Sequence, residues 1–300
     1  MTSQTTQPAT RLDRKRRRLM APASDTIAFQ GVAGAYSDLA CREKFPRLGT
    51  LPCETFADTF EAVSAGRARL AMIPIENSVA GRVADIHHLL PESGLYIVAE
   101  HFQRVHHHLL APPGATLKGL THVHSHVQAL TQCRRMIRGL KLKAEVHGDT
   151  AGAAKEVAER GDPTQAAIAS ELAAEIYGLT ILKRGLEDAK HNTTRFVIMA
   201  RQAVDPDPHR GPVMTSFIFR VRNVPAALYK VMGGFATNGV NMLKLESYML
   251  DGSFTSTQFY AEIEGHPKAR NLRLAFEELA FFSRFVKVLG VYPEDPARRR

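Results

Sequence analysis

The sequence predicts two α/β lobes in series, followed by a smaller α+β unit. Three observations support this division. Over residues 25–201, short apolar segments alternate with helical patterns, as in α/β folds. Residues 202–213 (QAVDPDPHRGPV) are rich in proline and charge, the composition of an interdomain linker. Residues 214–293 show the order strand, helix, strand, strand, helix, strand, which is typical of a ferredoxin-like sandwich.

The first lobe is expected to begin with a strand at Thr26–Phe29. Gly31 and Gly34 then interrupt the chain before a helix at Tyr36–Phe45. The later elements expected here are a helix near Thr55–Ala65, a strand at Leu70–Pro74, a helix from about Arg82 to Leu90 and a strand at Leu95–Ala99. Alternation of this kind favours a parallel or mixed sheet covered by helices.

A second lobe, over about residues 105–188, opens with a strand at Val105–Ala111. Its other expected elements are a strand near Leu120–Val123, a helix at Val127–Ile137, a strand at Leu142–His147, a helix at Ala151–Arg160, a strand at Ala166–Ala169 and a helix at Glu171–Tyr177. A further strand at Thr194–Ala200 could return to the first lobe, which the pattern alone does not decide. A cleft between two lobes is the usual place for a ligand.

The C-terminal unit is expected to build an antiparallel sheet with helices on one side. Its strands lie near Thr215–Val221, Met242–Leu250, Thr255–Ile263 and Val286–Val291, and its helices near Ala226–Thr237 and Lys268–Ala280. Asp251-Gly252 stands between two β-rich runs and signals a tight hairpin.

The composition indicates a soluble globular protein, with 44% hydrophobic and 23% charged residues in a chain of 300. No apolar run reaches the roughly 18 residues that a membrane-spanning helix needs. No apolar segment follows the early basic residues, which argues against a secretory signal. The three cysteines are odd in number and scattered, as expected of free thiols. We therefore expect a cytoplasmic location.

The net charge of +9 resides mainly at the two ends of the chain. Residues 1–24 carry +5 and the last three arginines add +3, so the body from 25 to 297 is nearly neutral at +1. A basic arm can bind nucleic acid or an anionic surface. The simpler interpretation is a disordered, solvated leader (1–24) and a basic tail (294–300), without a nucleic-acid or membrane partner.

Small polar residues cluster where predicted strands give way to helices. Gly31 and Gly34 lie in the turn GVAGAYS, where glycine lets the backbone approach a ligand and the helix start offers N–H groups to an anion. The same pattern also fits an ordinary turn between strand and helix. The spacing lacks G-x-G-x-x-G, so it is not a dinucleotide fingerprint.

Two further junctions carry polar side chains. Glu76, Asn77 and Ser78 follow an apolar strand, at the strand end where open α/β sheets bind ligands, although such residues also cap helices. The second lobe offers Ser125, His126, Gln128 and Gln132 at one helix start and Asp149 with Thr150 at the next. Three such helix starts could face one anionic ligand.

The segment Asn192-Thr193-Thr194-Arg195-Phe196 leads into the last strand of the α/β region. An arginine beside hydroxyl groups suits a carboxylate, because its planar fork binds both oxygens. The run His106–His108 does not predict a metal site, because neighbouring strand positions point to opposite faces. For His122, His124 and His126, no Cys or carboxylate stands beside them at the spacing of a zinc site.

The order of these motifs is more specific than any one of them. The segments GVAGAYS, PIENSVAG, SHVQALTQC, DTAGAA, AAIAS and NTTRF together resemble the prephenate dehydratase family over residues 26–200. Residues 215–292 resemble the ACT domain that this family carries. The resemblance implies a bilobal catalytic domain shaped like a periplasmic binding protein, with the active site in the cleft. It also implies conversion of prephenate to phenylpyruvate on the route to phenylalanine.

The resemblance assigns site residues by motif. Thr194 matches the family's essential threonine, and Arg195 and Phe196 complete that motif. The other positions expected to act in catalysis are Glu76, Asn77 and Gln132, and those expected to bind substrate are Gly34, Ser78, Ser125, His126, Gln128 and Thr150. We expect Thr194 to hydrogen-bond the leaving hydroxyl and Arg195 to hold a carboxylate. Because the product ring is aromatic, neither a cofactor nor a metal is expected.

The ACT resemblance implies an L-phenylalanine site between subunits, and hence a homodimer or homotetramer. The positions that it assigns to the effector are Ala226, Ala227, Leu228, Asn238, Gly239, Asn241, Glu246 and Ser247. This chain departs from the family pattern twice, since G-A-L-V is replaced by Ala226–Tyr229 and E-S-R-P by Glu246–Met249. About 25 residues precede the first strand, too few for the chorismate mutase domain of bifunctional relatives, so a monofunctional enzyme is expected.

Two alternatives remain open at this level. An arogenate dehydratase would use the same scaffold on a substrate that carries an amino group in place of the keto oxygen. A non-catalytic amino-acid sensor would use the lobes and the ACT domain for binding alone, which the intact NTTRF segment argues against.

Overall fold

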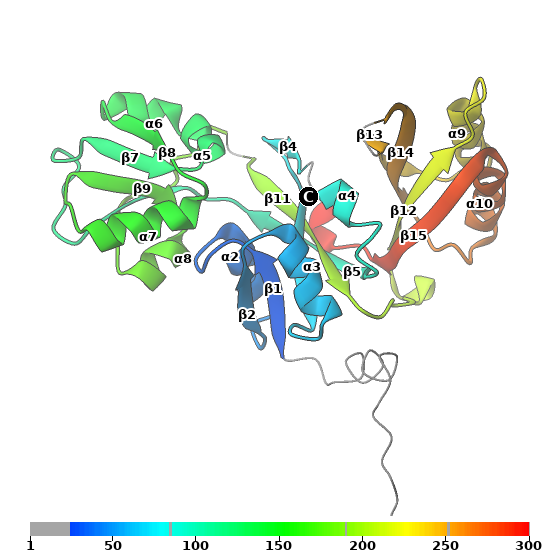
Figure 1. Cartoon of the computed structure of the whole chain (residues 1–300), viewed down its shortest axis with the longest axis horizontal. Helices are drawn as coiled ribbons and strands as arrows, with labels where there is room; N and C mark the ends of the chain where they lie inside the picture. The colour runs from blue at the N-terminus through cyan, green and yellow to red at the C-terminus, as the bar shows by residue number, and fades with distance from the viewer. Residues whose placement is uncertain (1–24, 84–85, 190, 251–252, 300) are drawn as a thin grey trace, which may run out of the picture.

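Three β-sheets organise the computed structural model, which describes residues 25–83, 86–189, 191–250 and 253–299. Each sheet forms the centre of one unit, and the three units lie side by side along the longest axis (Figure 1). The prediction of a mixed α/β fold is confirmed. The predicted leader, residues 1–24, lies outside the described residues.

The first sheet has the strand order β2-β1-β3-β11-β5, with the short β4 paired to β3. Its strands are β1 (Thr26–Gln30), β2 (Gly49–Cys53), β3 (Leu70–Asn77), β4 (Gly81–Arg82), β5 (Tyr96–Arg104) and β11 (Thr193–Ala200), and its helices are α2 (Tyr36–Lys44), α3 (Phe56–Ser64) and α4 (Ile86–Leu89). Strand β1 is parallel to β2 and β3, whereas β11 is antiparallel to β3 and β5. The last strand of the α/β region therefore returns to the first sheet.

The second sheet has the order β10-β6-β9-β7-β8. Its strands are β6 (His108–Ala111), β7 (His122–Ser125), β8 (Lys143–Val146), β9 (Gln165–Ala169) and β10 (Thr180–Lys183), and its helices are α5 (Val127–Gln132), α6 (Arg134–Gly139), α7 (Thr150–Arg160) and α8 (Glu171–Tyr177). Helix α7 begins at the Asp149 cap, ends at Gly161 in the left-handed region, and buries a face of small alanines in the core.

Four details of the sequence-based prediction are wrong. The helix expected at Val127–Ile137 is two helices, because Cys133 (φ −118°, ψ 23°) leaves helical geometry between them. The helix expected from Arg82 shrinks to α4, because Arg82 pairs in β4. Strands β2 and β10 were not predicted. Both are half-exposed edge strands without an apolar run, and β2 contains Pro52, which edges tolerate.

The third sheet has the order β13-β14-β12-β15 and is antiparallel throughout. Its elements are β12 (Val213–Val221), α9 (Ala227–Thr237), β13 (Met242–Leu250), β14 (Ser253–Glu264), α10 (Arg270–Phe282) and β15 (Ser283–Pro293). The predicted hairpin residues 251–252 lie outside the described residues, but Leu250 and Ser253 on either side are paired. Between this sheet and β11, the predicted linker contains only the short 3-10 helix η1 (Pro208–Arg210).

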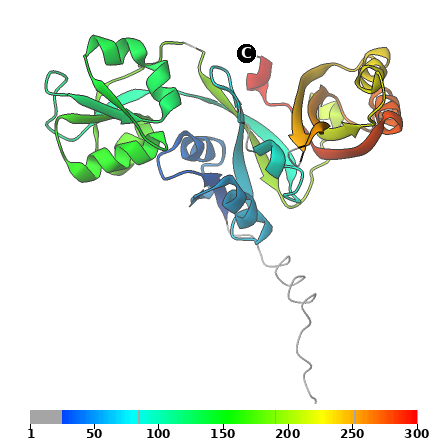
Figure 2. The ribbon, with the colours of Figure 1, turned by 45° about the horizontal axis from the view of Figure 1, so that its top comes forward.

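Both faces of the third sheet are covered. Phe217 and Phe219 on β12 pack under α9 and α10, whereas Met214 and Ile218 on the same strand join the core of the first sheet. Because side chains alternate along a strand, one strand serves two cores. Figure 2 shows the helices of this unit on the side away from the first sheet.

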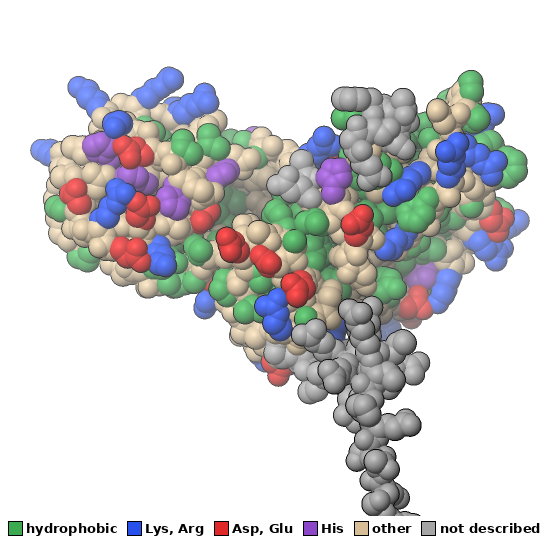
Figure 3. Space-filling model, viewed as in Figure 1, with side chains coloured by type: hydrophobic (Ala, Val, Ile, Leu, Met, Phe, Trp, Pro, Cys, Tyr) green, Lys and Arg blue, Asp and Glu red, His purple; other side chains and the backbone are tan. Residues whose placement is uncertain are grey.

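The described part of the predicted basic tail, residues 294–299, contacts the rest of the fold. The last segment forms the 3-10 helix η2 (Pro296–Arg299), and Arg298 is bonded to the fully buried Glu100 of β5. The arginines are visible in the sequence, but the buried carboxylates that they pair with are not. Figure 3 shows Lys, Arg, Asp and Glu side chains spread over the visible face, with no large patch of one sign. No described helix is long and apolar enough to cross a membrane.

The contact between β5 and β15 is so close that it requires glycine. A Cβ on Gly290 would lie 2.1 Å from the carbonyl oxygen of Ile97. We therefore expect Gly290→Ala to destabilise the protein by about 1–3 kcal/mol in urea unfolding, since the strands must move apart. Gly233→Ala is the control, because nothing lies within 4 Å of its Cβ position. That change fills a helix interior and should stabilise by about 0.5–1 kcal/mol. Equal effects would contradict this account of the interface.

Candidate active site

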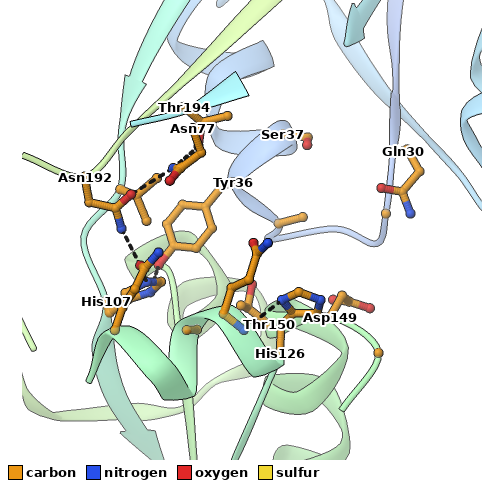
Figure 4. A pocket seen from close by; sticks show the side chains of 17 residues that line it. Gln30, Tyr36, Ser37, Asn77, His107, His126, Asp149, Thr150, Asn192 and Thr194 are labelled. Carbon is orange, nitrogen blue, oxygen red and sulfur yellow. Dashed lines mark hydrogen bonds between the residues drawn. The ribbon is translucent and has the colours of Figure 1, made fainter. Parts of the chain in front are cut away.

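A cavity of about 260 Å³ lies between the first and second units. It is lined by the turn after β1, the end of β3, the starts of α2, α5 and α7, and the segment entering β11 (Figure 4). The polar side chains in its wall are Gln30, Tyr36, Ser37, Asn77, His107, His126, Gln128, Gln132, Asp149, Thr150, Asn192 and Thr194. The cavity therefore collects residues from segments that are far apart in the sequence.

The register of β3 and β11 decides which side chains reach the cavity. Thr194 lies opposite Asn77, and Arg195 lies opposite Glu76. Since side chains alternate between the faces of a sheet, the first pair points to one face and the second to the other. Thr194 and Asn77 line the cavity, whereas Arg195 is buried on the side of the C-terminal unit.

A chain of hydrogen bonds links the two units across the cavity (Figure 4). The Asn77 amide donates to Thr194 Oγ1 (3.0 Å) and to Asn192 Oδ1 (2.8 Å). The Asn192 amide donates in turn to Gln132 Oε1 (2.6 Å), and His107 Nε2 lies 2.9 Å from the same oxygen. The chain thus joins strand β11 of the first unit to helix α5 of the second.

The orientation of Asn77 leaves the Thr194 proton free. The backbone N–H groups of Val79 and Ala80 donate to Asn77 Oδ1, at 2.9 and 2.8 Å. This oxygen is therefore the acceptor, and the amide nitrogen must be the donor to Thr194. Since Thr194 Oγ1 accepts that bond, its own hydroxyl proton is available to a ligand in the cavity.

The His107 ring is uncharged in this series of hydrogen bonds. Burial lowers the pKa of His107, and this outweighs the opposing effects of the bond to Gln132 and of the nearby Glu187. Neutral His107 donates from Nε2 to Gln132, which leaves Nδ1 as an acceptor 2.8 Å from the Tyr36 hydroxyl. That hydroxyl also lies 2.8 Å from the carbonyl oxygen of His106, so its single proton serves one acceptor at a time.

The cavity can receive an anion without a cationic side chain. None of the residues described in its wall is Lys or Arg, and Asp149 is the single carboxylate among them. Helix α2 starts at the cavity with Ala35 as its cap and no side chain bonded to its free N–H groups. Among the described residues, no group of three or more His, Cys, Asp or Glu is placed to hold a metal ion.

Half of the predicted site residues lie in this wall. The structure brings together Asn77, His126, Gln128, Gln132, Thr150 and Thr194. The motifs assigned no role in the site to Gln30, Tyr36, Ser37, His107, Asp149 and Asn192, which also line the cavity. Tyr36, Ser37, Asp149 and Asn192 belong to the quoted motifs, so their position was a usable signal. His107 and Gln30 depend on how the lobes meet, which no local pattern shows.

Four of the predicted residues serve the packing instead. Phe196 is fully buried in the core behind the first sheet, next to Phe29 and Met72. Ser125 is also fully buried and donates to the carbonyl of Ile168. The other two join segments: Ser78 donates to the carbonyl of His191 and accepts from Thr193, and Gly34 accepts from the Ser170 hydroxyl. A Cβ on Gly34 would lie 2.9 Å from Ala173 Cα, so glycine permits the contact of two units.

Glu76 and Arg195 belong to a buried charge cluster rather than to the cavity wall. Arg195 donates to Glu76 (2.9 Å) and Glu100 (2.9 Å), lies 2.9 Å from Glu262, and is 4% exposed. Lys244 of β13 pairs with Glu76 from the other side. Burial alone would raise the pKa of Glu76, but Lys244 and Arg195 outweigh it and lower that pKa. The expectation that Arg195 holds a substrate carboxylate is therefore wrong.

The predicted effector residues do not form one site within the chain. A second cavity of about 790 Å³ contains Ala226, Ala227 and Leu228 in its wall, beside Arg220, Arg222 and Arg284. The other predicted residues are engaged elsewhere: Asn238 donates to Glu278, Asn241 donates to Glu264, Glu246 pairs with Lys244, and the Ser247 carbonyl accepts from Arg82. Gly239 follows α9 at φ +64°, away from this wall.

Comparisons with known proteins agree with this architecture. The sequence profile described as prephenate dehydratase matches residues 27–204. A Komagataeibacter europaeus protein named bifunctional N-acyl-homoserine lactone acylase/prephenate dehydratase is 57% identical over 91% of this chain and 98% of its own length. Arogenate dehydratase/prephenate dehydratase 6 of Arabidopsis thaliana is 38% identical over 90% of this chain and 69% of its own.

A solved structure is similar as well. The prephenate dehydratase of Arthrobacter aurescens, described in complex with L-Phe, is 28% identical and superimposes with a TM-score of 0.81 over 89% of both chains. The similarity therefore extends over all three units and not over the first two alone.

The lowered pKa of His107 predicts a pH dependence of stability. The folded protein favours the neutral ring, so its contribution is complete above the ordinary histidine pKa of about 6.5 and is lost as the pH falls below it. A tenfold weaker binding of the proton by His107 in the folded state corresponds to about 1.4 kcal/mol of folding stability. We expect His107→Gln to lose less stability than the unchanged protein between pH 7.5 and 5, measured by urea unfolding. Parallel losses in both proteins would show that His107 does not titrate in this way.

Proposed function

The chain belongs to the prephenate dehydratase family, and we propose that it converts prephenate to phenylpyruvate in the cavity between the first two units. The observation that supports this most is the Thr194 hydroxyl, fixed by Asn77 with its proton free toward the cavity. Members of this family are hydro-lyases, which break a carbon–oxygen bond. The reaction requires a donor to the departing oxygen, and Thr194 supplies one.

The reaction requires mainly that the enzyme hold the substrate in the right position. Prephenate loses its ring hydroxyl and one carboxylate, as water and carbon dioxide, and the electrons of the broken C–C bond complete an aromatic ring. The departing hydroxide takes up a proton. Thr194 stabilises that oxygen by a hydrogen bond, and Asn77 strengthens the donor because its own N–H is bonded to the Thr194 oxygen. Positioning contributes more than proton transfer, since a threonine hydroxyl is a weak acid.

The substrate carboxylates would be bound without lysine or arginine side chains. The free N–H groups at the start of α2 and the side chains of Gln128, His126 and Thr150 surround the cavity. In a site closed to water such fixed dipoles stabilise negative charge effectively. Neither a metal nor a cofactor has a part in this proposal.

Arogenate is the second candidate substrate, and Asp149 is the observation that favours it. Arogenate carries an ammonium group where prephenate carries a keto oxygen. Asp149 is the one carboxylate in the described wall and could pair with that group. Its Oδ1 also accepts from the Gly152 N–H as the cap of α7, so its position is well determined.

Hydrolysis of N-acyl-homoserine lactones is a second candidate activity. It rests on the 57% identity to a relative named for both activities.

The third possibility, a sensor that binds without turnover, would use the same cavity.

We further propose that residues 214–293 form an ACT domain that binds L-phenylalanine between subunits of a homodimer or homotetramer in the cytoplasm. The Arthrobacter structure is described with this ligand, and the order of strands and helices fits. Ala226 has the left-handed backbone conformation (φ +62°) that favours glycine, which is the residue that the family has at this position. The shape of this turn is therefore kept although the residue differs.

The test is product formation by the purified chain from prephenate, arogenate and an N-acyl-homoserine lactone in parallel, with and without L-phenylalanine. Phenylpyruvate from prephenate, suppressed by L-phenylalanine, would support both parts of the proposal. If arogenate alone is turned over, arogenate replaces prephenate as the substrate. If only the amide bond of the N-acyl-homoserine lactone is hydrolysed, the acylase activity replaces the dehydratase activity. No turnover would favour the sensor.

Thr194 should be the most sensitive position. Thr194→Val keeps the shape and removes the donor, so we expect kcat for prephenate to fall by about 10²–10⁴-fold. Thr194→Ser keeps the hydroxyl and should stay within about tenfold of the original, since only a methyl group is lost. Steady-state kinetics checks both. Near-full activity of a folded Thr194→Val protein would contradict the proposed role.

A further inference from the structure

The last residues of the chain return to the first unit after leaving β15. The Asp295 N–H donates to Glu100 (3.0 Å), and Lys44 of α2 pairs with the Asp295 carboxylate (2.8 Å). Arg298 follows and is only 14% exposed, which is unusual for an arginine. In Figures 1 and 2 the red end of the ribbon lies beside the strands of the first sheet.

Arg298 inserts between two carboxylates that belong to different units. Its guanidinium donates to Glu100 of β5 (3.0 and 2.5 Å) and to Glu262 of β14 (3.2 Å). Both carboxylate side chains are fully buried. Arg195 contacts the same two groups and Glu76. Without Arg298 these three carboxylates would be left with Arg195 and the peripheral Lys244, which also pairs with Glu246. A buried charge left without its partner destabilises its surroundings strongly.

The two arginines are also joined through Phe102. The Arg195 and Arg298 guanidinium carbons lie 5.9 and 5.8 Å from the centre of its ring. Phe102 is the residue of β5 directly opposite Arg195 of β11. Arg298 therefore fixes Arg195 in two ways, by neutralising the carboxylates that they share and by packing on the same ring.

We propose that Arg298 is a positioning residue for the cavity. It sets the place of Arg195, and through the backbone of β11 it sets the neighbouring Thr194 on the opposite face of the sheet. The C-terminal unit would thereby act on the site through charge balance at its border rather than through contact with the ligand. The catalytic part of this inference depends on the proposed dehydratase function.

The first measurement compares Arg298→Met with Arg299→Met. Arg299 is the matched control, because it lies on the same short helix but is 63% exposed and pairs with Glu294. We expect Arg298→Met to lower kcat for prephenate by about tenfold with KM changed by less than about twofold, because the substrate still binds but Thr194 is displaced. Arg299→Met should leave both constants unchanged. An unchanged kcat in folded Arg298→Met would overturn the proposal.

Charge balance supplies a rescue that a general packing defect would not show. The double variant Glu100→Gln/Arg298→Met removes one carboxylate and one guanidinium, so the net charge of the cluster, in which Lys244 also pairs with Glu246, is the same as in the original protein. We expect kcat to return to within about threefold of the original. A double variant as slow as Arg298→Met would contradict the charge mechanism. If Arg298→Met does not fold, Arg298→Lys takes its place, with the charge kept, the planar fork lost and a smaller decrease expected.

Hydrogen exchange separates this proposal from the proposed function. Backbone amides of residues 193–200 should exchange faster in Arg298→Met than in Arg299→Met, and the double variant should restore their protection. This measurement needs no substrate. If the original protein does not turn over prephenate, the proposed function fails, and the exchange rates still decide whether Arg298 positions β11. Equal rates in both single variants would reject that role.

Discussion

The alternation of side chains along β11 is the constraint on which the rest of this structure depends. The strand is buried between β3 and β5, so each of its faces must meet a different environment. One face presents Thr194 to the cavity, and the other presents Arg195 to the C-terminal unit. A shift of one residue in register would exchange the two side chains and place a charge in the cavity and a hydroxyl among three carboxylates. The site and the border between units are therefore specified together.

The two faces of β11 also explain why charged side chains are buried around Arg195. An ion cluster of this depth gives little net stability compared with an apolar contact, but it tolerates only one arrangement of its members. Each carboxylate comes from a different strand, β3, β5 or β14, so the cluster fixes the relative placement of the first and third sheets. On the cavity side, the neutral chain from Asn77 to His107 does the same for the first and second sheets.

Most of the architecture was predictable from the sequence, because buried strands and capped helices leave local patterns. Helix α8 was placed correctly at both ends and α7 to within one residue. The edge strands β2 and β10 were missed, since a half-exposed strand lacks an apolar run. The motifs found Thr194 and Asn77, but they could not show that Arg195, one residue away, points elsewhere. Likewise, Arg298 could not be distinguished from a solvated tail residue, because its partners are distant in the chain.

In this account the ligand binds in the cavity beside Thr194 and Asn77. A crystal structure of the chain with phenylpyruvate tests it most directly. We expect the aromatic ring to lie against Thr194 and the carboxylate to meet the N–H groups at the start of α2. Phenylpyruvate bound only in the cavity beside Arg220, Arg222 and Arg284 of the C-terminal unit would contradict the account.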